Sequence, residues 1–194
     1  MAQFSRFGLD EFFKQRNNNN NFRYEKGHIE KLFSALFIAL DLSLREQEQA
    51  FSMLSLAIRT TPNNSFLYPL LLGTLIVLKI KNYTLYRDFV SGKESQDAVF
   101  GYIKSSEKGK EFWDTNYGAA LEVDLLGCRS RHIDAQQLKL PYKQIVEAAS
   151  SSENEKKRAA FIIEILNEYR LNDSFGNLNY LVGKIDLVSD FGFM

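Results

Sequence analysis

The chain has 194 residues, enough for one domain, and 45% of them are hydrophobic, including 16 Phe and 9 Tyr, so a sizeable core is available. Lys plus Arg and Asp plus Glu number 24 each, and this zero formal net charge argues against broad binding to nucleic acid or to an anionic membrane. One cysteine excludes an intramolecular disulfide framework and a cysteine-rich zinc site. Only 3 Pro and 11 Gly interrupt the chain, which favours long helices over a many-turned β architecture.

The sequence shows neither a secretory signal nor a membrane span. The N-terminus, MAQFSRFGLDEFF, lacks the uninterrupted apolar segment of a secretory signal. The longest apolar run, Leu70 to Leu78, is too short to span a bilayer. The single cysteine, Cys128, suits a reducing compartment. We therefore expect a soluble, cytoplasmic protein.

Apolar residues recur at helical spacing through the first half of the chain and predict five helices. These helices cover residues 4–16, 26–40, 43–61, 66–79 and 82–90. The run of asparagines from Asn17 to Asn21 predicts a loop after the first helix. The third helix has a defined start and stop, because Ser43 and Glu46 are spaced for a capping box and Pro62 follows the last apolar turn. The fourth is apolar almost all round, which indicates a central buried helix.

The second half of the chain predicts five more helices, with two polar connections between them. The helices cover residues 95–105, 111–128, 142–149, 153–171 and 178–189, and the connections are SSEKGK (105–110) and RSRHIDAQQLKLP (129–141). The prediction is an all-α, irregular domain of roughly eight to ten helices with little or no sheet. It comprises one domain, 1–194, with a possible subdivision into residues 1–105 and 106–194.

Two short patterns bear on chemistry. FIALD (37–41) is similar to a Walker B strand, but no G-x-x-x-x-G-K-[ST] phosphate loop accompanies it, so we favour the end of an amphipathic helix. Asp124, Cys128 and His132 would share a helix face and could hold a metal or form a reactive thiol pair. A buried cysteine without such a role is the favoured alternative. The sequence therefore predicts no catalytic residue and no metal site.

One compact basic spot stands out in the neutral sequence. It consists of Arg129, Arg131 and His132, and it could meet a phosphate or an acidic partner. The alternative, which we favour, is a plain surface loop.

Four segments resemble the C-terminal helical region of the KAP family of P-loop NTPases. They are FGLDEFF (7–13), LSLREQEQAFSMLSLAIRTTP (42–62), LYPLLLGTLIVLKIKNYTLYRDFVSG (67–92) and, more loosely, KIDLVSDF (184–191). In that family a nucleotide-binding core precedes the helical region. The resemblance implies a lid or regulatory domain whose partners are the N-terminal P-loop core of the same protein and a further, unknown protein. It also implies that ATP and Mg²⁺ bind in the parent protein, and that this chain has no cofactor and no catalysis of its own.

The resemblance also suggests a role for Arg45, which lies in the first turn of a predicted helix. A cation at this positive end of the helix dipole typically lowers the stability of the helix by about 0.3–1 kcal/mol. Helical lids of related ATPases often carry an arginine at the start of a helix, where it senses the nucleotide phosphates. Arg45 is accordingly a candidate nucleotide-sensing residue. The alternative is an arginine paired with Glu48 or Gln49 on an exposed helix face. The alternative for the whole chain is a stand-alone helical protein–protein interaction module.

Overall fold

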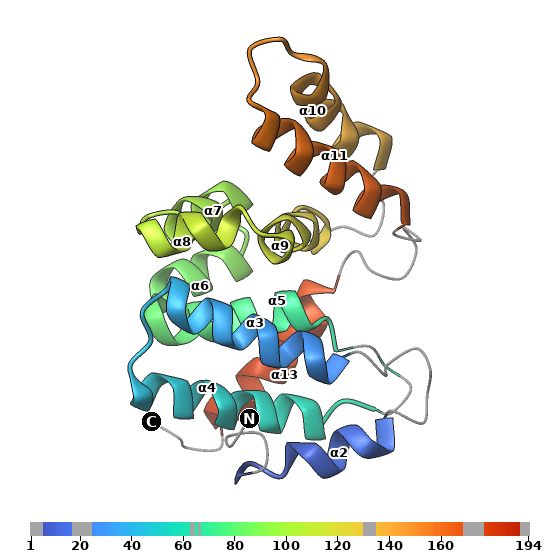
Figure 1. Ribbon diagram of the computed structural model, residues 1–194. Coiled ribbons are helices and arrows are strands. Elements are labelled where there is room, and N and C mark those ends of the chain that lie inside the picture. Colours follow the sequence, from blue (N-terminus) through green and yellow to red (C-terminus); the bar gives the residue numbers. More distant parts are fainter. Residues whose placement is uncertain are drawn as a thin grey trace.

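The computed structural model of the chain is built from helices (Figure 1). It describes residues 6–16, 25–62, 65, 67–129, 135–168 and 177–190. Within these residues lie eleven helices and no strand, so the predicted all-α fold is confirmed. The predicted loop from Asn17 to Asn21 lies outside the described residues.

Most predicted helices are present, with small shifts of their ends. The first five are α2 (Leu9–Arg16), α3 (Glu25–Ala39), α4 (Leu44–Arg59), α5 (Pro69–Lys81) and α6 (Tyr83–Val90). The remaining six are α7 (Gln96–Ile103), α8 (Glu107–Trp113), α9 (Asn116–Gly127), α10 (Ala135–Glu147), α11 (Glu153–Glu168) and α13 (Leu178–Asp190). The helix α2 begins later than predicted because Gly8 has a positive φ of 66° and turns the chain.

The helix α5 is the centre of the main core, as its composition predicts. Its side chains from Leu71 to Leu78 are all buried, and Pro69 occupies the first turn, where its missing N–H is not needed. The helices α3, α4, α6, α9 and α13 pack against it. Figure 1 shows the C-terminal helix α13, in red, crossing behind α4 and α5. Residues far apart in the sequence therefore share one apolar core around α5.

Aromatic rings fill the contact between α3, α4 and the N-terminal segment. The ring of Phe51 stacks on those of Phe7 and Phe33, with centroids 6.0 and 5.7 Å away. Phe37 meets Phe51 edge to face at 5.6 Å. Such pairs add to the free energy of area burial. Phe33, Phe37 and Phe51 are buried in the main core, and the partly buried Phe7 packs against it.

The predicted connection SSEKGK (105–110) and the single predicted helix 111–128 are both wrong. Ser106 caps α8, because its hydroxyl accepts a hydrogen bond from the N–H of Gly109 at 3.0 Å. Thr115 caps α9 in the same way, accepting from the N–H of Gly118 at 3.2 Å. Two side-chain caps thus divide the segment into two helices at a sharp corner.

The predicted connection 129–141 is also wrong in part, because α10 begins at Ala135 and continues through Pro141. A proline within a helix removes one backbone hydrogen bond and usually ends or bends the helix. Here the apolar side of α10 packs along α11, and Tyr142, the residue after the proline, is buried. Tertiary packing therefore outweighs the local signal of the proline.

The hairpin of α10 and α11 has a small apolar core of its own. Its members are Ala119, Val123, Tyr142, Ala159, Ile162 and Leu166. The first two belong to α9, whose Leu121 and Leu125 face the main core instead. Figure 1 shows the hairpin projecting beyond α9, away from α4 and α5. The helix α9 therefore joins the two cores.

Substitution of Gly118 should test the corner between α8 and α9. A Cβ atom at Gly118 would lie 2.4 Å from the carbonyl oxygen of Trp113, which belongs to the backbone and cannot move freely. We expect Gly118→Ala to lower the free energy of unfolding by about 1–3 kcal/mol, as overpacking does. Urea denaturation of the wild type and the variant measures this difference.

The matched control is Gly101→Ala, because Gly101 lies inside α7 with open space at its Cβ position. This change should raise the free energy of unfolding by about 0.5–1 kcal/mol, since alanine favours a helix interior over glycine. A Gly118→Ala protein as stable as the Gly101→Ala protein would contradict the geometry of the corner.

Candidate functional site

The turn between α3 and α4 has a closed backbone geometry. The N–H of Leu42 donates to the carbonyl of Phe37, and the N–H of Asp41 donates to the carbonyl of Ile38. Asp41 has a φ of 49°, so these bonds form a Schellman motif with an aspartate at the left-handed position. Residues 37–39 are therefore the end of α3, and the similarity of FIALD to a Walker B strand has no structural basis.

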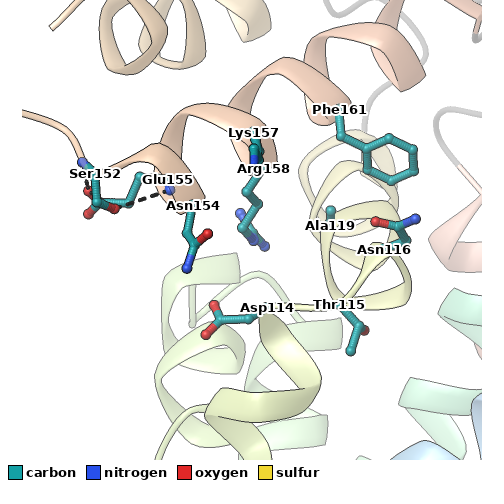
Figure 2. Close-up of a pocket in the computed structure, with 10 residues that line it drawn as sticks. All are labelled: Asp114, Thr115, Asn116, Ala119, Ser152, Asn154, Glu155, Lys157, Arg158 and Phe161. Atoms are coloured by element: carbon teal, nitrogen blue, oxygen red, sulfur yellow. Dashed lines mark hydrogen bonds between the residues drawn. The ribbon is translucent and has the colours of Figure 1, made fainter.

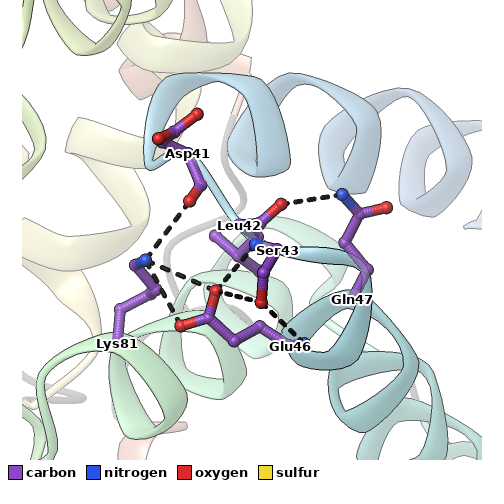
Figure 3. Close-up of polar contacts among 6 residues, drawn as sticks. All are labelled: Asp41, Leu42, Ser43, Glu46, Gln47 and Lys81. Carbon is purple, nitrogen blue, oxygen red and sulfur yellow. Dashed lines mark hydrogen bonds and ion pairs between the residues drawn. The ribbon is translucent and has the colours of Figure 1, made fainter.

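The helix α4 begins with the predicted capping box, which is confirmed. Glu46 Oε2 accepts hydrogen bonds from the N–H and the hydroxyl of Ser43 at 2.7 and 2.9 Å (Figure 3). Lys81, from the last turn of α5, lies 3.3 Å from Glu46 Oε1 and donates to the carbonyl of Asp41 at 3.3 Å. The capping box and Lys81 together fix the corner from two sides.

The electrostatics of this corner favour an ionised Glu46. Partial burial by itself raises the pKa of Glu46, but the hydrogen bonds from Ser43 and the charge of Lys81 outweigh it. The net effect is a pKa below the ordinary value of 4.5. The carboxylate is therefore charged at neutral pH and contributes to the stability of the corner.

Arg45 lies in this corner with its side chain exposed. It makes no hydrogen bond or ion pair with any residue that the structure describes. Its predicted alternative partner, Glu48, instead pairs with Arg6 at 2.7 Å. Two apolar side chains that flank the turn between α3 and α4, those of Ile38 and Leu44, are 63% and 77% exposed. Arg45, whose side chain has no partner among the described residues, thus directly follows an exposed apolar residue in the chain.

The basic spot is described only at Arg129, because Arg131 and His132 lie outside the described residues. The Arg129 guanidinium lies over the ring of Phe89, 4.4 Å from its centroid. It donates to the carbonyl of Phe89 and to that of Glu94, the latter at 2.7 Å. Arg129 therefore ties the end of α9 to the end of α6, and binding of a phosphate by this spot stays a prediction.

Cys128 is a buried free thiol. Desolvation raises the pKa of its thiol to about 12, and its Sγ donates to the carbonyl of Leu125 at 3.3 Å. The thiolate that a reactive cysteine or a metal ligand needs is therefore strongly disfavoured. His132 lies outside the described residues, and among the residues described no group of three or more His, Cys, Asp or Glu side chains could hold a metal ion.

Sequence reasoning missed a partly buried polar network that joins α9, α10 and α11. Glu122 Oε2 pairs with Arg158 Nη2 at 2.6 Å, and Glu122 Oε1 accepts from the hydroxyl of Tyr142 at 2.6 Å. Arg158 Nε donates to the carbonyl of Trp113 at 3.2 Å, and its guanidinium lies over the Trp113 ring. Arg158 precedes the buried Ile162 by one helical turn, so it lies on the apolar face of α11. A cation on an apolar helix face was the sequence signal that could have indicated an ion pair here.

A cavity lies beside this network (Figure 2). Its volume is about 850 Å³, and it opens between the α8–α9 corner and the first turns of α11. Side chains that line it include Asp114, Asn116, Asn154, Lys157, Arg158 and Phe161. Polar and apolar groups thus face one another across it.

Comparison with family models, with curated proteins and with solved structures found no match. The resemblance to KAP NTPases therefore stays a prediction. Within the described parts of the chain, no helix is long and apolar enough to cross a membrane.

Acid denaturation should test the role of Glu46. Because its pKa is lower in the folded than in the unfolded chain, the carboxylate stabilises the fold above about pH 4.5 and loses this effect as the pH falls through the folded pKa. We expect Glu46→Gln to lower the free energy of unfolding by about 1 kcal/mol at neutral pH. The variant should lose less stability than the wild type between neutral pH and about pH 3.5 in urea denaturation.

Glu111→Gln is the matched control, since Glu111 is exposed and makes no hydrogen bond or ion pair with the described residues. It should retain both the stability and the pH dependence of the wild type. Equal pH dependence of Glu46→Gln and the wild type would show that Glu46 has no special role in the corner.

Proposed function

We propose that this chain is the helical lid or regulatory domain of a KAP-type P-loop NTPase, and that Arg45 senses the nucleotide bound by the core of that enzyme. One observation supports this proposal above the others. The Arg45 side chain is exposed and has no partner among the described residues, although the helix start that carries it is held in place by a capping box.

The chemistry of this position suits a phosphate on another part of the protein. A guanidinium next to the positive end of a helix is unfavourable in isolation, by about 0.3–1 kcal/mol. A bound phosphate would offset this unfavourable energy, because both the guanidinium and the positive end of the helix attract it. The planar guanidinium can also form two parallel hydrogen bonds to phosphate oxygens.

The surroundings of Arg45 suit contact with a second domain. Leu44, the residue before Arg45, exposes most of its apolar side chain, and so does Ile38 in the last turn of α3. Contact with the nucleotide-binding core would bury this apolar surface and bring the arginine to the phosphates. The Schellman turn and the Lys81–Glu46 pair keep the corner rigid. A rigid corner would move as one unit when the nucleotide-binding core changes between its ATP-bound and ADP-bound states.

In this proposal the chain catalyses nothing by itself. Its sequence contains no G-x-x-x-x-G-K-[ST] loop to hold the phosphates. ATP and Mg²⁺ would bind in the core of the parent protein, in the cytoplasm. The coding sequence upstream of this chain is a direct check, because a Walker A motif in the same reading frame is expected there.

The exposed Leu44 and Ile38 also favour a second candidate function, a stand-alone helical protein–protein interaction module. In that case the same surface would bind another protein without any dependence on ATP. The absence of a P-loop core from the full reading frame would favour this candidate over the first.

Substitution of Arg45 should separate the two candidates. In this isolated chain, Arg45→Ala should leave the melting temperature unchanged or slightly higher, because a cation leaves the positive end of a helix. In the full-length protein it should lower ATP turnover by about a thousandfold, as loss of an arginine that acts on phosphoryl transfer does. Arg45→Lys should restore little activity, because an ammonium lacks the planar fork. Thermal melts and steady-state ATPase kinetics measure the two effects.

Lys143→Ala is the control for this experiment, since Lys143 is exposed on α10, in the distant hairpin. It should change neither quantity. Normal ATP turnover in Arg45→Ala would make Arg45 an ordinary surface residue, and a large loss of stability of the isolated chain would make it a structural one.

A further inference from the structure

The cavity between the α8–α9 corner and α11 has walls that are fixed before any ligand binds. Thr115 caps α9 on one side, and Ser152 forms a capping box with Glu155 on the other. The Glu122–Arg158 ion pair holds the two helices at this angle. A volume of about 850 Å³ is in the range of small-molecule and short-peptide sites. Fixed walls reduce the entropy lost on binding.

The groups that line the cavity carry both signs of charge. The Arg158 guanidinium pairs with Glu122, so it is not available to a charged ligand. Glu155 accepts hydrogen bonds from the uncharged Ser152, which lower the pKa of its carboxyl group, so it keeps its negative charge. Asp114 and Lys157 are exposed, and neither forms an ion pair with the described residues. Two carboxylates and one unpaired ammonium disfavour a phosphate and suit a hydrogen-bonding ligand that carries a basic group.

Two carboxamides face the cavity from different helices (Figure 2). Asn116 is in the first turn of α9 and Asn154 is in the first turn of α11. Both residues are exposed, and neither side-chain carboxamide makes a hydrogen bond to the residues that the structure describes. A carboxamide carries a donor and an acceptor side by side, and so does a peptide group. Two such groups on two walls complement an extended backbone.

An apolar patch lies at the end of the cavity next to Asn116. Figure 2 shows the ring of Phe161, from α11, beside Ala119 of α9. Phe161 is only half-buried, so a ligand side chain could cover its exposed part. Such a contact would bury apolar area and fix the register of the ligand.

We propose that this cavity binds an extended peptide segment of a partner protein. The ligand backbone pairs with the carboxamides of Asn116 and Asn154, and one of its apolar side chains packs on Phe161. Asp114 and Lys157 favour charged residues of opposite sign at other positions of the ligand. The site involves α9 and α11 and is independent of Arg45, so it stands whether or not the chain is a lid.

A display library of random peptides is the probe for this site. The wild-type chain is immobilised, peptides are selected, and the binding of each selected peptide is measured by fluorescence anisotropy. Since each carboxamide would contribute hydrogen bonds, we expect the Asn116→Ala/Asn154→Ala double variant to bind the selected peptides about tenfold more weakly or worse. Nuclear magnetic resonance should show chemical-shift changes in the side-chain amides of these two residues.

Asn167→Ala is the matched control, because Asn167 is an exposed asparagine of α11 that does not line the cavity. It should bind the selected peptides as the wild type does, and thermal melts should show that all variants are folded. Failure to select any peptide above background would overturn the proposal. Equal binding by the double variant and the wild type would overturn it as well, since the peptides would then occupy another surface.

Discussion

Burial of α5 on all sides is the constraint on which the rest of the structure depends. Five helices, α3, α4, α6, α9 and α13, cover it. A helix can be surrounded in this way because its backbone hydrogen bonds are satisfied internally and its side chains are almost all apolar. Thr74 is the one polar residue in the fully buried run from Leu71 to Leu78, and its hydroxyl has no hydrogen-bond partner among the described residues.

The end of α5 connects this core to the start of α4 and to the C-terminal helix α13. Lys81 reaches Glu46 at the start of α4, and Lys79 reaches Asp186 of α13 at 2.7 Å. Tyr86 also donates to Asp186, at 3.0 Å. Two cations in the last turn of one helix, where the dipole favours them, therefore anchor the corner that carries Arg45 and the C-terminal helix.

The parts of the fold that the sequence predicts are those that depend on neighbouring residues in the chain. The capping box of Ser43 and the apolar stripe of α5 depend on residues within a few positions, so both could be predicted. The start of α8 at Ser106 could not, because polar residues after a serine fit a loop or a capped helix equally well. The continuation of α10 through Pro141 depends on packing against α11, which no local pattern records.

The candidate sites likewise combine features that neighbouring residues predict with features that only the tertiary structure reveals. The position of Arg45 in a first helical turn follows from its neighbours. That it has no side-chain partner among the described residues depends on tertiary structure, because Glu48 pairs with Arg6 from another segment. The Glu122–Arg158 pair and the cavity depend on the angle between α9 and α11, so a tertiary structure is needed to find them.

Native-state hydrogen exchange tests the central role of α5 most directly. Amides in the buried part of α5 should exchange only through global unfolding, with a free energy equal to that from urea denaturation. Amides of α10 and α11, which share a smaller core, should exchange through openings of lower free energy. Exchange of the α5 amides as fast as those of α10 would contradict a fold built around α5.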